Sequence, residues 1–460
     1  MQELKNFQFE NVKFMHVKFE NATGLIALGT YPLNFVNRAG LISACSDADP
    51  EVISRVCRQW RSIILSMPLL WSTFYIYGPK KQHESKLALW LERSKTCLLT
   101  FQLTESWTAD PDILRNILSQ LISQVHRWKD AHIYVSTAAQ HSLLEIRPGA
   151  ASSLQSADLH LRDWDVPHAD KMWQILHSSS SLTQADWQHL YLGGPPNHAP
   201  WAQLTHLFLY HPVTPSMLVD ILCSCKQLTE LRVWSLIPGS SPPVSSDLLL
   251  PHLRLLVMDG YGVDPGLVID RLTLPSLSHV RVPEKHCTRP SLLNLLIRSR
   301  CCLRTFILDE GHITEERILA YLALPEFRSV MHLILRVPLT DKILLALFRR
   351  EVEHDGRIHV VDFFPKLRTL HIKDLTMPER RLPDGLVAAM VQSRLACDIQ
   401  RGLSRLQYIE MGYLPDRERH FPCDFLWLMG MGRLNDGLSV VLKTICSSGR
   451  RASVMGPMVF

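Results

Sequence analysis

The sequence has no long hydrophobic run, little net charge and few glycines for its length. No segment of the 460 residues approaches the roughly 18 uninterrupted apolar residues of a membrane span. Glu3, Lys5 and Glu10 interrupt any apolar run near the start, so we expect no signal peptide. The net charge of +5 is small for this length and gives no reason to expect a nucleic-acid or membrane partner.

Metal-binding and catalytic spacings are also missing. The 11 cysteines are scattered and odd in number, which is typical of reduced thiols in the cytosol or nucleus. The sequence contains no G-x-x-x-x-G-K-[ST], G-x-S-x-G or H-E-x-x-H. His168-Ala169-Asp170 matches half of an iron facial triad, but Pro167 beside it favours an ordinary helix start. We therefore predict no enzyme, no catalytic residue, no metal and no cofactor. The closely spaced cysteines are predicted to be core thiols: Cys223, Cys225, Cys301 and Cys302.

A helix, a stop and a strand are predicted between Glu51 and Tyr77. Apolar residues recur there at three- and four-residue spacing, which predicts one apolar stripe on a helix: Ile53, Val56, Cys57, Trp60, Ile63 and Ile64. Asp49 and Pro50 favour a helix start, and Pro68 favours its end. Residues 74–77 (FYIY) are typical of a strand.

The order of these residues is more specific than their spacing. Residues 56–61 (VCRQWR), 67–72 (MPLLWS) and 87–94 (LALWLERS) resemble the second half of an F-box and its continuation in F-box proteins of mushroom-type fungi. Pro32 stands 28 positions before Trp60, a separation that suits the Leu-Pro start of that family. The resemblance implies a three-helix module that binds a Skp-type adaptor and presents substrates to a cullin–RING ubiquitin ligase. The adaptor-binding residues that it implies are Pro32, Val56, Cys57, Trp60 and Trp71.

Further along, a motif of the form L-x-x-L-x-L recurs with helix-like runs between its copies. Its first positions are Leu204, Leu228, Leu253, Leu277, Leu303, Val330, Leu367 and Leu406, with separations of 24, 25, 24, 26, 27, 37 and 39 residues. Trp187/Leu190/Leu192 and Leu159/Leu161 are read as earlier members. A period in the twenties, with one strand and one helix in each unit, is the leucine-rich-repeat signature. Extra helical turns or loops are predicted in the longer units, around Arg349–Asp362 and Pro378–Arg401.

The predicted fold class is α/β: a leucine-rich-repeat solenoid, an irregular horseshoe, behind a small helical F-box-like module. The predicted boundaries are 1–28 for an N-terminal extension, 29–78 for the F-box-like module, 79–155 for a connecting segment where the repeats begin, 156–446 for the repeats and 447–460 for a flexible tail.

The side chains between the leucines of each strand are expected on the concave face, because strand side chains alternate in direction. Phe208, Tyr210, Arg232 and Trp234 are predicted to bind a protein substrate there, since aromatic and arginine side chains anchor interfaces. The expected partners are a Skp-type adaptor, a cullin and an unknown protein substrate, with no nucleic acid or membrane, in the cytoplasm or nucleus. The competing interpretation is an interaction scaffold that has lost adaptor binding, because Tyr31 replaces the family's leucine and Gly40 interrupts the first helix.

Overall fold

A computed structural model describes a mixed α/β protein whose chain divides into two compact units, residues 1–146 and 147–460. The structure describes residues 50–187, 196, 198–209, 212–239, 247–258, 263–281, 290–308, 313–337, 339–354, 357–372, 383–395, 403–413, 423–424, 426–428, 430 and 438–444. The predicted N-terminal extension, the first F-box helix and the predicted tail lie outside these residues.

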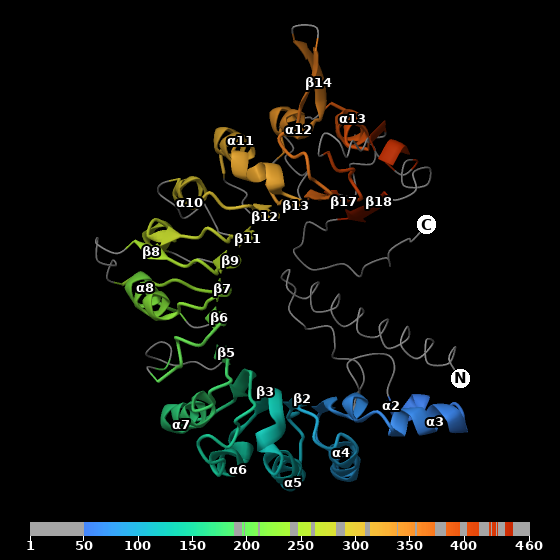
Figure 1. Ribbon diagram of the computed structural model, residues 1–460, viewed down its shortest axis with the longest axis vertical. Coiled ribbons are helices and arrows are strands. Elements are labelled where there is room, and N and C mark those ends of the chain that lie inside the picture. The colour runs from blue at the N-terminus through green and yellow to red at the C-terminus, as the bar shows by residue number, and fades with distance from the viewer. Residues whose placement is uncertain are drawn as a thin grey trace. The chain divides into compact units, whose positions relative to one another are not determined.

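Unit 1 places helices against one side of three parallel strands (Figure 1). Its elements are α2 (Pro50–Ile53), α3 (Arg58–Leu65), η2 (Pro68–Trp71), β1 (Thr73–Tyr77), α4 (Lys81–Arg93), β2 (Leu99–Thr104), α5 (Pro111–Ile122), η3 (Val125–Arg127), β3 (Trp128–Val135), η4 (Thr137–Ala139) and α6 (Gln140–Leu144). Aromatic rings form much of its core: Phe74 stacks on Phe101 with centroids 6.0 Å apart, and Phe101 meets Trp128 edge-on at 5.1 Å.

Unit 2 is built on one row of parallel strands. In order across the sheet these are β4 (Ser156–Leu161), β5 (Gln184–Trp187), β6 (His206–Leu209), β7 (Glu230–Val233), β9 (Leu255–Met258), β11 (His279–Arg281), β12 (Thr305–Leu308), β13 (His332–Leu335), β16 (Thr369–Ile372), β17 (Tyr408–Tyr413) and β18 (Ser439–Thr444). A separate two-stranded sheet joins β8 (Leu248–Leu249) to β10 (Leu272–Thr273).

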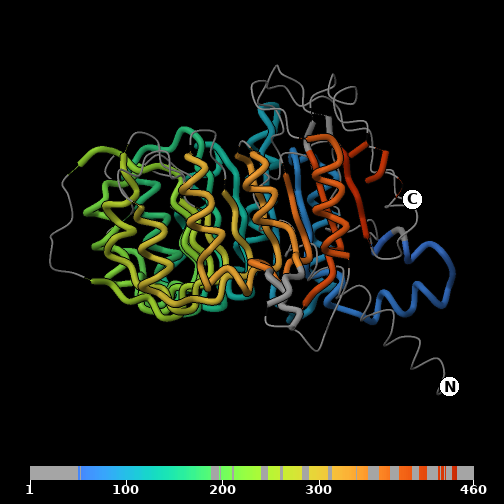
Figure 2. Tube along the Cα trace, turned by 90° about the horizontal axis from the view of Figure 1, so that it is seen from above, coloured from blue at the N-terminus to red at the C-terminus, as the bar shows by residue number. Residues whose placement is uncertain are grey.

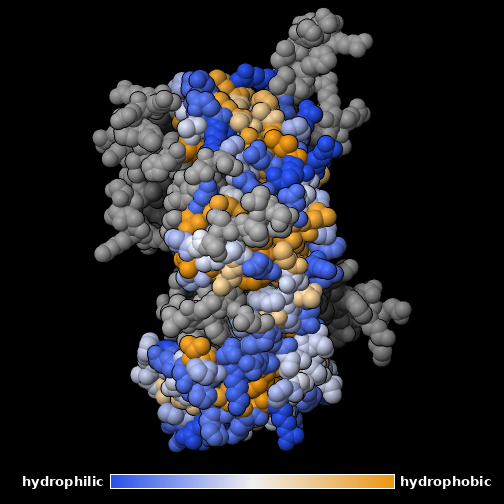
Figure 3. Space-filling model, turned by 90° about the vertical axis from the view of Figure 1, so that its left-hand side faces the viewer, coloured by the Kyte–Doolittle hydropathy of each residue, from blue (hydrophilic) through white to orange (hydrophobic). Residues whose placement is uncertain are grey.

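The helices of unit 2 lie side by side behind this row of strands (Figures 1 and 2). They are α7 (Val166–His177), α8 (Pro215–Ser224), α9 (Gly266–Ile269), α10 (Ser291–Ser299), α11 (Glu315–Leu322), η6 (Pro325–Ser329), α12 (Asp341–Leu347) and α13 (Leu386–Ser393). Side chains that accept from the first free N–H groups mark several helix starts: Asp165, Thr214, Thr314 and Thr340. Hydrophobic side chains on the molecular face in Figure 3 form separate groups among hydrophilic ones.

The strand register of the later motifs agrees with the prediction. In β6, Leu207 and Leu209 are buried while His206 and Phe208 between them are partly exposed, and β7 repeats the alternation with Leu231 and Val233. In parallel register Leu207 pairs with Leu231. Successive motifs therefore stack leucine on leucine behind the sheet, and their intervening side chains share the other face.

The two earliest members of the series were predicted in the wrong register. Ala185 pairs with Leu207 of β6, and Trp187, two residues further on, is buried and pairs with Leu159 of β4, so Trp187 holds the last position of its motif rather than the first. The motif is Leu182/Ala185/Trp187, and the one before it is Leu154/Ala157/Leu159. Alanine stands where later units have leucine, and both alanines are buried.

The same strand pattern begins well before residue 156. Trp71 at the end of η2 stands at the motif spacing from Phe74 and Ile76 in β1, and all three are buried. Phe74 pairs with Phe101 and Ile76 with Leu103 in the parallel register of the later strands. β1 therefore belongs to a strand row, although it falls inside the predicted 29–78 module.

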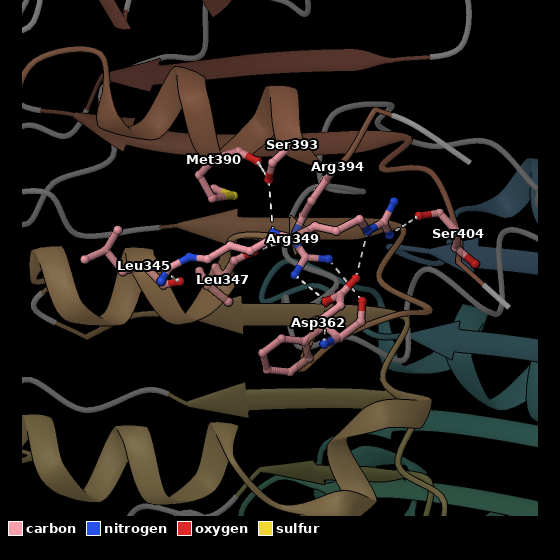
Figure 4. Close-up of polar contacts among 10 residues, drawn as sticks. Leu345, Leu347, Arg349, Asp362, Met390, Ser393, Arg394 and Ser404 are labelled. Carbon is pink, nitrogen blue, oxygen red and sulfur yellow. Dashed lines mark hydrogen bonds and ion pairs between the residues drawn. The ribbon is translucent and has the colours of Figure 1, made fainter. Parts of the chain in front are cut away.

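The long unit after β13 contains a β-hairpin where extra helical turns or loops were predicted. β14 (Arg350–His354) pairs antiparallel with β15 (Arg357–Val361), apart from the main sheet. A buried arginine cluster, defined as Arg349, Asp362 and Arg394, joins its two ends (Figure 4). Arg349 Nε donates to Asp362 Oδ2 at 2.9 Å, and Arg394 Nη2 donates to Asp362 Oδ1 at 2.8 Å.

Candidate functional site

The F-box-like segment is not one continuous helix. Helix α2 ends at Ile53 and α3 begins at Arg58, with Cys57 extended at φ −158° and ψ 171° between them. The Cys57 thiol accepts a hydrogen bond from the Trp60 backbone N–H at 3.4 Å and so caps α3. The predicted apolar stripe is therefore split: Ile64 is buried, whereas Val56, at the break, is 67% exposed.

Large apolar side chains remain exposed on this short segment. Val56 is joined by Trp60 at 44%, Leu65 at 36% and Leu69 at 65% exposure. Arg55, Arg58 and Arg61 beside them are also exposed. Apolar residues gathered within 14 positions of sequence are the kind of surface that another protein covers.

Contacts with α4 fix the position of this segment. Trp90 Nε1 donates to Glu51 Oε1 at 3.0 Å, and Lys86 Nζ lies 3.4 Å from the same oxygen. Trp71 is completely buried, meets Trp90 edge-on at 5.4 Å and donates to the Ile64 carbonyl at 3.0 Å. The structure thus assigns Trp71 to the core and not to a binding surface. Pro32 lies outside the described residues.

The predicted substrate-binding residues lie on adjacent strands of unit 2. Phe208 on β6 and Arg232 on β7 are register partners, and the Arg232 guanidinium carbon lies 5.1 Å from the Phe208 ring centroid. Glu230 lies 3.8 Å from both the Arg232 guanidinium and the His206 imidazole. These four partly exposed residues form a mixed aromatic and charged patch.

Trp234 follows β7 and extends this patch with 38% of its surface exposed. Its backbone N–H donates to the Leu209 carbonyl at 2.8 Å, which fixes the residue beside β6. Tyr210 lies outside the described residues. We therefore define the aromatic patch by three of the four predicted residues: Phe208, Arg232 and Trp234.

A second polar group on the strand face was not predicted. The Tyr408 hydroxyl donates to Glu410 Oε2 at 3.0 Å, and His371 Nδ1 lies 3.4 Å from the same oxygen. Burial, followed by the charge of Glu410, raises the pKa of Tyr408 to about 12. Alternation along the strand at 408–413 could have placed Tyr408 and Glu410 on one face, but neither has a distinctive spacing.

The His168-x-Asp170 motif is divided between two different contacts. His168 contacts Asp165, the residue that caps α7, so it belongs to the first turn of that helix, as predicted. Asp170 Oδ1 instead accepts from His198 Nε2 at 2.9 Å. His198 Nδ1 lies 2.8 Å from His177 Nδ1, which completes what we call the histidine cluster: Asp170, His198 and His177.

Tryptophan rings surround the inner end of the histidine cluster. Trp173 stacks on His177 with centroids 5.2 Å apart, and Trp187 meets the same imidazole edge-on at 5.7 Å. Burial, with a smaller contribution from the charge of His198, lowers the pKa of His177 to about 3. His177 is therefore neutral at pH 7, and its Nδ1–H donates to His198 when His198 donates to Asp170.

The cysteines divide into two kinds. Cys225 and Cys301 are buried, and burial raises the pKa of each thiol to about 12, as expected for inert core thiols. Cys223 and Cys302 are exposed, so the prediction of core thiols was wrong for these two. Cys223 lies near the end of α8, and Cys302 lies between α10 and β12.

The sequence matches no family model and no curated protein. Within the described ranges, no group of three or more His, Cys, Asp or Glu side chains is arranged to hold a metal ion. Nor does the described part of the chain contain a helix with the length and apolarity needed to cross a membrane.

Proposed function

We propose that this protein is a substrate-recognition adaptor of a Skp–cullin–RING ubiquitin ligase. In this proposal the segment around α3 binds a Skp-type adaptor. Unit 2 is a leucine-rich-repeat solenoid that binds a protein substrate on its strand face. The resemblance of residues 56–61 and 67–72 to an F-box motivates the first role, and the stacked strand–helix units support the second.

The exposed apolar surface of the F-box-like segment is the main support. A soluble protein rarely leaves four large apolar side chains uncovered on one short stretch unless a partner covers them. Val56, Trp60 and Leu69 lie within a segment whose core is already filled by Ile64 and Trp71. Among the described residues, the core of this segment is thus formed without these three side chains.

The competing function is an interaction scaffold without adaptor binding. The break between α2 and α3 favours it, because it divides the stretch that the apolar spacing predicted as one helix and that carries the F-box resemblance. Both functions leave unit 2 as the binding domain, so the two differ only in what residues 50–71 do.

Co-purification with a Skp-type adaptor separates these two functions. The full chain is co-expressed with the adaptor, and Trp60→Ala should reduce the captured adaptor by more than about tenfold, since truncating an interface tryptophan typically costs at least about 2 kcal/mol of binding. Trp60 is 44% exposed, so the variant should keep its unfolding temperature.

Trp107→Ala is the matched control, because Trp107 is an 85% exposed tryptophan of unit 1 outside the F-box-like segment. This variant should capture as much adaptor as the wild type. Failure of the folded wild-type protein to capture any adaptor would overturn the ligase proposal and leave the scaffold.

A further inference from the structure

Three arginines occupy equivalent positions at the amino-terminal edge of the unit 2 sheet. Arg254, Arg304 and Arg368 directly precede β9, β12 and β16. Main-chain hydrogen bonds show the equivalence: Arg304 N donates to the Ser278 carbonyl at 2.8 Å, and Ser278 N donates to the Arg254 carbonyl at 2.9 Å. Arg368 is linked to Arg304 through residue 331 in the same way. Successive arginines are thus two strands apart, or about 10 Å.

Two histidines lie between the arginines. His279 on β11 and His332 on β13 are both register partners of Thr305 on the strand between them. Burial, then the nearby His332 and Arg304, lowers the pKa of His279, and Glu230 opposes this effect. Burial, then His371 and Arg368, lowers the pKa of His332. Arg304 and Arg368 thus each contribute to the lowered pKa of a histidine, and we call the three arginines and two histidines the basic edge.

Among the described residues, none carries a charge paired with the arginines of the basic edge. Arg254, Arg304 and Arg368 are exposed. No ion pair or side-chain hydrogen bond connects their guanidinium groups to another residue in the described part of the chain. Arg349 and Arg394, by contrast, are held by Asp362. Uncompensated like charges at this spacing attract a ligand of opposite charge.

The first half of the same edge shows that the fold does not need these arginines. The equivalent residues before β5, β6 and β7 are Thr183, Thr205 and Thr229. Their hydroxyls bond to the carbonyl of the preceding unit, as when Thr229 Oγ1 donates to Thr205 O at 2.8 Å. Threonine therefore satisfies this position, and arginine there is free for another role.

We propose, building on the substrate role proposed for unit 2, that the basic edge binds an acidic segment of the substrate protein. The segment has carboxylates at every third residue. A polyproline II segment repeats its side chains on one face every three residues, or about 9.3 Å, which matches the spacing of the three arginines. Such a segment crosses the strands at their amino-terminal ends and places one carboxylate at each guanidinium group.

The probe is a fluorescein-labelled, proline-rich peptide with glutamate at every third position, measured by fluorescence anisotropy on the full chain. Binding should weaken as salt is added. The triple variant Arg254→Thr, Arg304→Thr and Arg368→Thr copies the neighbouring units. It should lose roughly 10–100-fold in affinity, because each exposed charge pair contributes about 0.5–1 kcal/mol.

A control variant removes three other exposed positive charges, of which Lys81 and Arg115 are paired with acidic side chains: Lys81→Thr, Arg115→Thr and Lys171→Thr. It should bind the peptide as the wild type does. A peptide with glutamine in place of glutamate should not bind. Equal losses in both triple variants, or equal binding of the glutamine peptide, would overturn the inference.

Lowering the pH from 7.5 to 5.5 should strengthen binding, because a bound carboxylate favours the protonated forms of His279 and His332. Replacing both with glutamine should abolish this pH dependence, although Glu230, His371, Arg304 and Arg368 still face the site.

Tighter binding of a single-stranded oligonucleotide of equal charge would instead identify a nucleic-acid site and overturn the proposal that the ligand is an acidic peptide. Adaptor capture by the triple variant must stay unchanged. If the wild-type chain captures the adaptor but does not bind the peptide, this inference alone is refuted and the ligase proposal stands.

Discussion

The two polar clusters inside unit 2 each join a helix to neighbouring segments, but they do so with different chemistry. The histidine cluster joins α7 to the segment before β6, and the arginine cluster joins α12, the hairpin and α13. In the first, tryptophans surround a neutral imidazole. In the second, one carboxylate pairs with two buried guanidinium groups, and the Leu347 and Phe364 carbonyls accept further hydrogen bonds from Arg394.

The difference shows what each cluster can tolerate. Protonation of the buried, neutral imidazole destabilises the folded state, so the first cluster is sensitive to acid. A buried ion group is insensitive to moderate pH but fails when one partner is removed, because the other charge is then buried alone. The amino-terminal edge of the sheet also differs between its two halves: threonines precede β5, β6 and β7, and arginines precede β9, β12 and β16.

The largest effect is expected from breaking the arginine cluster. Asp362→Ala leaves Arg394, which is fully buried, and Arg349 without their common carboxylate. Removing one partner of a buried ion pair costs about 3–5 kcal/mol, so chemical denaturation should show a loss of that size. Asp112→Ala removes a carboxylate from an exposed pair with Arg115 and should change stability by less than about 1 kcal/mol. Equal losses for both variants would show that Asp362 does not hold the cluster together.

A smaller, pH-dependent effect is expected from the histidine cluster. The pKa of His177 is about 3 in the folded chain and about 6.5 when unfolded, so the unfolded state binds an extra proton between these values. Stability should therefore fall as the pH drops below about 6.5, with a loss of about 2 kcal/mol at pH 5. His177→Asn keeps a polar group near Nδ1 but cannot titrate. Its stability should change less between pH 7 and pH 5 than that of the wild type, and an identical pH dependence would contradict the assignment.

Much of the strand row could be predicted from leucine spacing, but the clusters could not. Leucines at the motif positions predicted the buried face of β6 to β17, because burial alternates along a strand whatever the partners are. The prediction failed at Ala157 and Ala185, where small residues hide the motif. The hairpin had a local signal, Asp355-Gly356, a dipeptide typical of tight turns. The contact of Arg394 with Asp362 spans 32 residues, and no local pattern indicates it.

The candidate site could likewise be predicted from the sequence only in part. The aromatic patch followed from alternation on adjacent strands, and Phe208 and Arg232 do lie beside each other. Helical spacing placed Cys57 on an apolar stripe, but its backbone is extended and its side chain caps α3. Spacing alone cannot distinguish a continuous helix from two short ones, because both repeat apolar residues at the same intervals.

The smallest effect on stability is expected at Trp234, on the open face of the same sheet. Trp234 is 38% exposed, whereas Trp187 is fully buried among the rings around the histidine cluster. Trp187→Ala should cost about 3–5 kcal/mol of unfolding free energy, the usual loss for a buried aromatic. Trp234→Ala should cost less than about 1 kcal/mol, because solvent already reaches its ring. Both values come from one set of denaturation curves. A loss at Trp234 as large as that at Trp187 would place its ring in the core and remove it from the aromatic patch proposed to bind the substrate.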